Sequence, residues 1–129
     1  MKMESMRQIK FKGNSRDTKN WVYGSLVKTP FGTFIEWYED SVCNKVEIDP
    51  STVCQYTGLK DSKGQDIWEH DILKSQDGVM IEVVYSKGSF MMQSISKYGH
   101  LVENPLCYFM KDKKTVDCVI KCSKFDKEV

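Results

Sequence analysis

The stretch VCQYTGLKDSKGQDIWEHDILK (residues 53–74) decides the fold that we expect for this chain. Its glycines, Gly58 and Gly64, bracket a polar loop, and glycine takes a positive φ at a turn without a steric penalty. Two apolar pairs, Ile-Trp and Ile-Leu, flank the charged triplet Glu-His-Asp at residues 69–71. This pattern is typical of short strands joined by a tight bend in small β-barrels, and Asp71 is placed to cap backbone N–H groups at the bend.

The composition extends this interpretation to the rest of the chain. Alanine is absent and leucine occurs five times, whereas Val, Ile, Thr, Tyr, Phe and Trp together supply 41 of the 129 residues. Branched and aromatic side chains pack well on a pleated sheet and lose rotamer freedom in a helix. Turn residues divide the apolar runs at short intervals, and no segment indicates a helix longer than a turn or two. We therefore expect a mostly β fold, as a small barrel or sandwich.

Two details of this fold can be predicted near the C-terminus. Alternation places a set of four side chains on one face of a strand: Val116, Cys118, Ile120 and Cys122. Residues 94–114 are the least regular part of the chain, and we expect either a long loop or a short helix there.

The length fits one domain or two small β subdomains. The best point of division is Asp49-Pro50-Ser51, which predicts an N-terminal β subdomain with a basic arm (1–50) and a C-terminal subdomain (51–129). One continuous domain remains the alternative. Hydrophobic residues make up 40% and charged residues 29%, a globular mixture that differs from the composition of a disordered chain.

The sequence favours a cytoplasmic protein. No apolar run approaches the roughly 20 residues that span a bilayer, and no apolar core follows the first residues as it would in a signal peptide. The five cysteines are an odd and scattered set in a chain large enough to form its own core. We therefore expect reduced thiols rather than a secreted disulfide framework, and no membrane partner.

The motifs already quoted resemble those of the YopX family of bacteriophage and prophage proteins. The family pattern has a Gln-Tyr-Thr-Gly-Leu-Lys-Asp turn, a glycine, and then Ile-aromatic-Glu-Gly-Asp-Ile, which residues 55–72 follow closely. The earlier segments Ile9–Gly13 and Trp21–Leu26 are also typical of the family. The resemblance covers residues 9–74, and the rest of the chain is similar only in its alternating strands.

Two departures from the family pattern concern the bend and the C-terminus. His70 stands where the family commonly has glycine, and the usual ending, Ile-Gly-Asn-aromatic-acid-Asn-Pro, is replaced by residues 119–125. The resemblance implies a phage or prophage origin, a C-terminal part similar to SH3-like barrels and a homo-oligomer. It brings no established reaction and no catalytic residues to carry over.

The triplet Glu69-His70-Asp71 groups two acids with a potential base. In a strand, Glu69 and Asp71 would share a face and His70 would point away, so three adjacent residues rarely form a working triad. A catalytic or metal-bound histidine is one interpretation, and an ordinary surface or turn histidine is the one that we prefer.

The cysteines give only a weak indication of a metal site. Cys118 and Cys122 are four residues apart, but the remaining candidate ligands show no second paired spacing of the Cys-x-x-Cys kind that zinc sites use. A buried apolar role for Cys118 is the simpler interpretation. Phosphate-binding glycine loops and the nucleophile-elbow pattern are absent. We therefore expect no catalytic residue, no metal and no cofactor.

A local basic arm is the only feature that resembles a nucleic-acid footprint, because the overall balance is 19 basic against 18 acidic side chains. Residues 1–20 carry six basic and two acidic groups, followed by aromatic rings that could stack on bases. The candidate nucleic-acid residues are Lys10, Lys12, Arg16, Lys19, Trp21 and Tyr23. The alternative is a strand edge protected by lysines, with the two rings in the core.

A surplus of aromatic and methionine side chains near the irregular segment suggests a subunit interface. The candidates are Met91, Met92, Tyr98, Tyr108, Phe109 and Met110. The alternative is that these side chains cover the open end of a barrel within one chain. Acidic groups in residues 36–50, five against one lysine, could also meet the basic arm of another copy.

Together these features predict a phage or prophage protein that is not an enzyme and that forms a homo-oligomeric interaction or structural module. The alternative is a nucleic-acid-binding regulator that uses the basic arm on a small barrel. Phage or host proteins are further possible partners.

Overall fold

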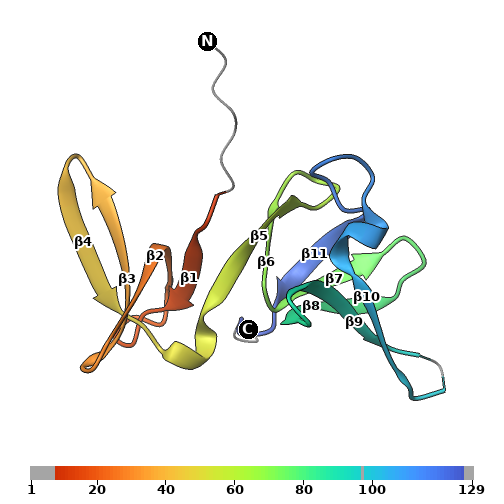
Figure 1. The fold of residues 1–129 in the computed structure, drawn as a ribbon, viewed down its shortest axis with the longest axis horizontal. Coiled ribbons are helices and arrows are strands. Elements are labelled where there is room, and N and C mark those ends of the chain that lie inside the picture. The colour runs from red at the N-terminus through yellow and green to blue at the C-terminus, as the bar shows by residue number, and fades with distance from the viewer. Residues whose placement is uncertain (1–7, 97, 127–129) are drawn as a thin grey trace, which may run out of the picture. The chain divides into compact units, whose positions relative to one another are not determined.

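The computed structural model describes residues 8–96 and 98–126, which fold almost entirely as strands (Figure 1). No α-helix occurs within these ranges; there are two 3-10 helices, η1 (Pro50–Thr52) and η2 (Leu106–Phe109), and no described helix is long and apolar enough to cross a membrane. The strands are β1 (Phe11–Asn14), β2 (Trp21–Thr29), β3 (Gly32–Glu39), β4 (Val42–Glu47), β5 (Cys54–Lys60), β6 (Asp66–Trp68), β7 (Asp71–Ser75), β8 (Met80–Ser86), β9 (Ser89–Ile95), β10 (Leu101–Pro105) and β11 (Cys118–Ser123).

Two antiparallel sheets confirm the mostly β prediction. Hydrogen bonding orders one as β4-β3-β2-β1-β5-β6 and the other as β10-β9-β8-β7-β11, and neither order closes on itself. The chain divides into two compact units, which we call unit 1 (Met1–Tyr56) and unit 2 (Thr57–Val129). The boundary lies within β5, later in the chain than the division predicted after residue 50. Lys2 and Arg7 of the predicted basic arm lie outside the described residues.

Strands β1 to β4 of unit 1 form a meander, because each of β1, β2 and β3 pairs with the next strand along the chain. The end of β4 returns to β1 through a bridge between Ser15 and Ile48 and a 2.9 Å hydrogen bond from the Asp49 N–H to the Asn14 carbonyl. Ile48 is fully buried by this return. A Cβ on Gly13 would lie 2.5 Å from Ile48 Cδ1, so a larger residue there would require the Ile48 side chain to shift.

Unit 2 has a concentrated apolar core on one face of its five-stranded sheet. Alternate residues of β7 and β8, among them Leu73, Ile81 and Val83, point to this face, as the two-residue period of a strand requires. The core cluster consists of Ile67, Leu73, Ile81, Val83, Met92, Leu106, Val116 and Cys118.

The polar loop of the family motif is organised by Asp61, which is fully buried. One oxygen of its carboxylate accepts hydrogen bonds from the N–H groups of Lys63 and Gln65, both at 2.9 Å, and the other accepts from the Ile120 N–H at 3.0 Å. Gly64 completes the turn with φ of 82°. The loop therefore closes on itself and is also fixed to β11.

The strand predicted from Val116 to Cys122 was wrong in two respects. The strand begins only at Cys118, and its register shifts between Ile120 and Cys122, which pair with consecutive residues of β7. This bulge places an extra residue, Lys121, in β11 and breaks the alternation, so Cys122 is exposed while Cys118 is buried.

The segment 94–114 is more regular than we predicted. It contains β10, which forms an antiparallel hairpin with β9 in which Leu101 pairs with Ile95 (Figure 1). It also contains η2, which places Leu106 in the core of unit 2. Pro105 obscured the strand in the sequence, but it pairs at the end of β10, an edge strand of the sheet, where proline is tolerated.

Candidate functional site

The bend of the family motif explains why this position commonly holds glycine. His70 has φ of 70°, in the left-handed region that glycine adopts most easily. Its N–H donates to the Val83 carbonyl at 2.6 Å. The next residue, Asp71, is buried and accepts a 2.8 Å hydrogen bond from the Trp68 N–H, which confirms the predicted cap at the bend.

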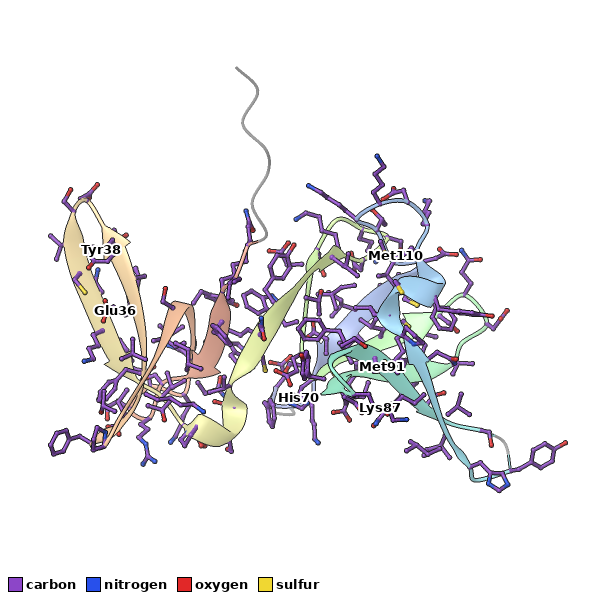
Figure 2. The ribbon with its side chains drawn as sticks, viewed as in Figure 1. Glu36, Tyr38, His70, Lys87, Met91 and Met110 are labelled. Atoms are coloured by element: carbon purple, nitrogen blue, oxygen red, sulfur yellow. The ribbon has the colours of Figure 1, made fainter. Side chains whose placement is uncertain are left out.

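The His70 ring, whose residue is labelled in Figure 2, lies between two acids and an aromatic side chain of unit 2. Its Nδ1 is 3.1 Å from Glu82 Oε2, and its Nε2 is 3.7 Å from Glu69 Oε2. Because an ionised carboxylate only accepts, a hydrogen bond to Glu82 requires the tautomer with its proton on Nδ1. The ring also meets the Phe125 ring edge-on at 5.2 Å, and Lys124 Nζ lies 3.7 Å from Glu82.

The predicted arrangement of the charged triplet was therefore wrong. The positive φ of His70 breaks the alternation of an extended strand, so Glu69 lies beside the imidazole and Asp71 turns to the backbone. These contacts tie the β6–β7 bend to β8 and to the residues after β11. The arrangement accounts for His70 as a turn residue that is fixed by charge and ring contacts.

No group of three or more His, Cys, Asp or Glu side chains within residues 8–96 and 98–126 is arranged to hold a metal ion. The five cysteines are free thiols, with Cys54 and Cys118 buried and the other three exposed. Burial, reinforced by the nearby charge of Asp117, raises the pKa of the Cys118 thiol. Cys118 is thus the small apolar core residue that we preferred.

The predicted basic arm is largely engaged within unit 1. Lys12 is buried, with its ammonium 4.2 Å from the centre of the Trp21 ring, and Lys10 lies 4.5 Å from the centre of the Tyr56 ring. These are cation–π contacts that stabilise the unit itself.

The remaining candidates of the arm lie nearer the surface. Arg16 Nε is 3.6 Å from Glu47, and Lys19 Nζ donates to the Arg16 carbonyl at 2.9 Å. Trp21 is half-buried and Tyr23 is exposed. The structure therefore does not gather the six predicted residues around one open groove.

The predicted interface residues separate into two groups. Met91 and Met92 are buried, and Phe109 and Met110 are partly buried against the core, so these four do not form an exposed patch. Figure 2 labels Met91 and Met110 in unit 2. The exposed members are Tyr98 and Tyr108, with 75% and 74% of their surface accessible. An interface through this set would therefore rest on the two tyrosines.

A different apolar surface lies on the outer face of the five-stranded sheet of unit 2. Met80, Ile95 and Leu101 are 48%, 66% and 61% exposed there. Ile95 and Leu101 are paired across the β9–β10 hairpin, and Met80 is paired with Lys74 across β7 and β8. These residues surround a depression of about 250 Å³, which we call the apolar hollow. It is lined by Ile72, Met80, Ile81, Glu82, Gln93, Ser94, Ile95 and Leu101.

A second depression in unit 2 collects lysines from three separate segments. Lys74 comes from β7, Lys111 from the loop after η2, and Lys121 from the bulge in β11. We call this depression of about 360 Å³ the lysine hollow; it is lined by Ser62, Lys74, Ser75, Gln76, Lys111, Asp117, Cys118, Val119 and Lys121. Sequence reasoning missed it because these lysines are far apart in the chain, and only the lysine-rich run 111–114 hinted at a local charge.

The motifs that indicated a family resemblance are supported by an independent match. The family model described as YopX protein matches residues 1–116 of this chain. Among curated proteins, none matches the sequence.

Proposed function

The chain belongs to the YopX family. We propose that it acts as a non-enzymatic interaction module that binds further copies of itself. The apolar hollow of unit 2 is the surface that we assign to this contact. The observation that carries the proposal is the exposure of three large apolar side chains around one depression of a sheet face.

Exposed apolar side chains gathered at one place favour association, because burying each of them removes apolar surface from water. Full burial of a Met, Ile or Leu side chain contributes about 1.5–3 kcal/mol, so the partly covered trio would supply a few kcal/mol to an interface. Isolated exposed residues such as Phe31, at the turn between β2 and β3, carry no such implication.

The charges around the apolar hollow favour a second copy as the partner. Lys74 adjoins Met80 on one side of the apolar residues, and Glu82 with Gln93 forms the neighbouring pair of the sheet. A two-fold contact places the same surface on both subunits, so the lysine of one copy could approach the acidic side of the other. Glu82 also pairs with His70 and Lys124 of its own chain, so this charge contact adds to the apolar burial and is not its main source of stability.

Several features support a role without catalysis. The motif residues Asp61, His70 and Asp71 are engaged in turns and ion pairs that hold unit 2 together. His70 lines neither of the two hollows that we describe. We extend the proposal to a phage or prophage product in the bacterial cytoplasm, with unit 2 as a module similar to SH3-like barrels. The family resemblance and the free thiols support this extension.

Light scattering over a range of protein concentrations tests the proposal. We expect the unchanged protein to form a defined oligomer, and the triple variant Met80→Ser, Ile95→Ser, Leu101→Ser to be monomeric. The matched control is Phe31→Ser with Tyr38→Ser, which removes two exposed rings from unit 1 and should leave the oligomer intact. A monomer at every concentration of the unchanged protein would reject self-association.

A nucleic-acid-binding regulator that uses the basic arm remains the second candidate. It is supported by Arg16, whose side chain keeps 56% of its surface accessible despite its ion pair with Glu47. Fluorescence anisotropy with labelled single- and double-stranded oligonucleotides at low salt tests it. The candidate requires that Arg16→Gln weaken binding, and it fails if Arg16→Gln binds like the unchanged protein.

A further inference from the structure

We propose that the lysine hollow of unit 2 binds phosphate groups. The inference does not require self-association, with which it shares only Lys74, and it assigns a ligand chemistry to a surface that the sequence did not predict. Its basis is that three lysines, from β7, the loop after η2 and β11, line one depression.

The three lysines carry charge that is not neutralised within the hollow. Among the residues that the structure describes, Lys74, Lys111 and Lys121 make no ion pair, whereas Lys60, Lys87 and Lys124 each lie within 4 Å of a carboxylate. Like charges held together repel one another, so an anion that enters between them is attracted by all three.

One acid, Asp117, lines the hollow, and both oxygens of its carboxylate already accept a hydrogen bond. The Gln76 amide donates to both carboxylate oxygens of Asp117, at 3.0 and 3.2 Å. The hollow therefore has three positive charges against one negative charge. The side-chain hydroxyl of Ser75 accepts from the Val79 N–H at 3.1 Å and keeps its own hydrogen available to donate to an oxyanion.

The backbone that carries the lysines is fixed before any ligand arrives. Asp112 Oδ1 accepts from the N–H groups of Lys114 and Thr115, both at 3.0 Å, and the Lys111 N–H donates to the Thr115 carbonyl at 2.7 Å. The hydrogen bonds that Asp112 accepts, together with the nearby charge of Lys111, lower its pKa, so the loop keeps its ionised anchor in ordinary buffers. Lys121 occupies the bulge of β11, a feature that redirects a side chain from a strand.

Lysine suits this ligand because its ammonium is a compact point charge that binds phosphate oxygens without a fixed fork geometry. The phosphate could belong to a small free anion or to a single-stranded nucleic acid. The two sources differ in their salt dependence, since a strand that neutralises Z phosphates releases counterions with a slope of about 0.7 Z.

The test uses the full chain at low ionic strength, with pyrophosphate followed by calorimetry and a labelled oligothymidine followed by anisotropy. We expect saturable pyrophosphate binding that weakens about fivefold in Lys111→Gln and again in Lys121→Gln, as expected for the loss of a partly screened charge contact. Lys28→Gln, an exposed lysine of β2 in unit 1, is the matched control and should bind normally. Asp117→Asn should bind a few-fold more tightly, because it removes the negative charge.

The outcomes separate the ligand sources and the two proposals. Oligothymidine that competes with pyrophosphate and depends on the same lysines identifies a nucleic-acid phosphate, whereas pyrophosphate binding alone identifies a small anion. Either result supports the site. No binding of either probe, or an equal loss in Lys28→Gln, overturns it. The apolar triple variant should bind pyrophosphate normally, so failure of self-association leaves the phosphate result readable.

Discussion

Unit 1 and unit 2 use the same residue type, lysine, in different ways. In unit 1, Lys10, Lys12 and Lys45 lie over the rings of Tyr56, Trp21 and Phe34, at 4.2–4.6 Å from the ring centres. In unit 2, a continuous aliphatic core fills the interior, and lysines gather at a surface depression. A lysine that packs against a ring contributes to stability, whereas a lysine beside a hollow is available to a ligand.

This difference shows why counting charges along the chain does not locate the lysines that are free of internal contacts. The first twenty residues have the largest excess of basic groups, yet the structure uses several of them internally. The two units also differ in how they bury polar groups.

The largest expected effect concerns the buried carboxylate of unit 2. Asp61→Ala leaves the N–H groups of Lys63, Gln65 and Ile120 without their acceptor, and we expect a loss of about 2–3 kcal/mol in the free energy of unfolding. Asp49→Ala, which removes the cap of η1 in unit 1, should cost clearly less than Asp61→Ala. Urea unfolding measures both, and equal losses would contradict the comparison.

The second prediction exchanges lysines in the two units. Lys12→Gln removes a buried cation from the Trp21 ring, and we expect a loss of about 1–2 kcal/mol. Lys111→Gln alters an exposed side chain and should change stability by less than about 0.5 kcal/mol. The same urea series checks this, and an unchanged stability of Lys12→Gln would show that unit 1 does not depend on its packed lysines.

The third prediction separates backbone strain from side-chain contacts at residue 70. His70→Ala keeps the left-handed conformation and loses the contacts with Glu82 and Phe125, whereas His70→Gly loses the same contacts and relieves the strain. We expect the glycine variant to be about 1 kcal/mol more stable than the alanine variant. Equal stabilities would mean that the bend does not hold a positive φ in solution.

The smallest effect concerns the buried thiol of unit 2. The pKa of Cys118 is raised above its ordinary value of 9.0, mainly by burial, so the folded state holds this proton more tightly than the unfolded chain. Unfolding above that pH releases a proton, and stability should therefore fall as the pH rises through 9.0. Below it the thiol is protonated in both states and contributes no slope.

Urea unfolding below and above pH 9.0 measures this slope, with Cys118→Ala as the comparison variant. The variant should show a smaller fall, although it is less stable overall because it leaves a small cavity. A thiol-reactive dye gives a second readout: Cys43, Cys107 and Cys122 should react in the folded protein, and Cys54 and Cys118 only after unfolding. Rapid reaction of all five would contradict the burial.

The sequence predicted the class of fold because composition and turn residues act locally. The glycine turns, the cap by Asp71 and the resemblance carried by residues 53–74 follow from short-range patterns, and the structure confirms the β class and this cap. The expected alternation of side chains between the two faces of a strand fails at Lys121, where a bulge adds a residue, and at His70, where a positive φ turns the chain.

The candidate surfaces depend on pairing between distant strands, which alternation alone does not specify. Lys74 and Lys121 come together only because β7 pairs with β11, and Met80 approaches Ile95 only because β8 pairs with β9. The methionines predicted at an interface instead lie in the core or pack against it. The pairing of β8 with β9 and the position of η2 place them there. Local patterns cannot assign such contacts.

Hydrogen–deuterium exchange of the unchanged protein at two widely separated concentrations tests most directly whether the apolar hollow binds a second copy. The account predicts slower exchange at the higher concentration in β8 and in the β9–β10 hairpin, and no change in unit 1. Exchange that is independent of concentration throughout the chain, or slowing confined to unit 1, would contradict it.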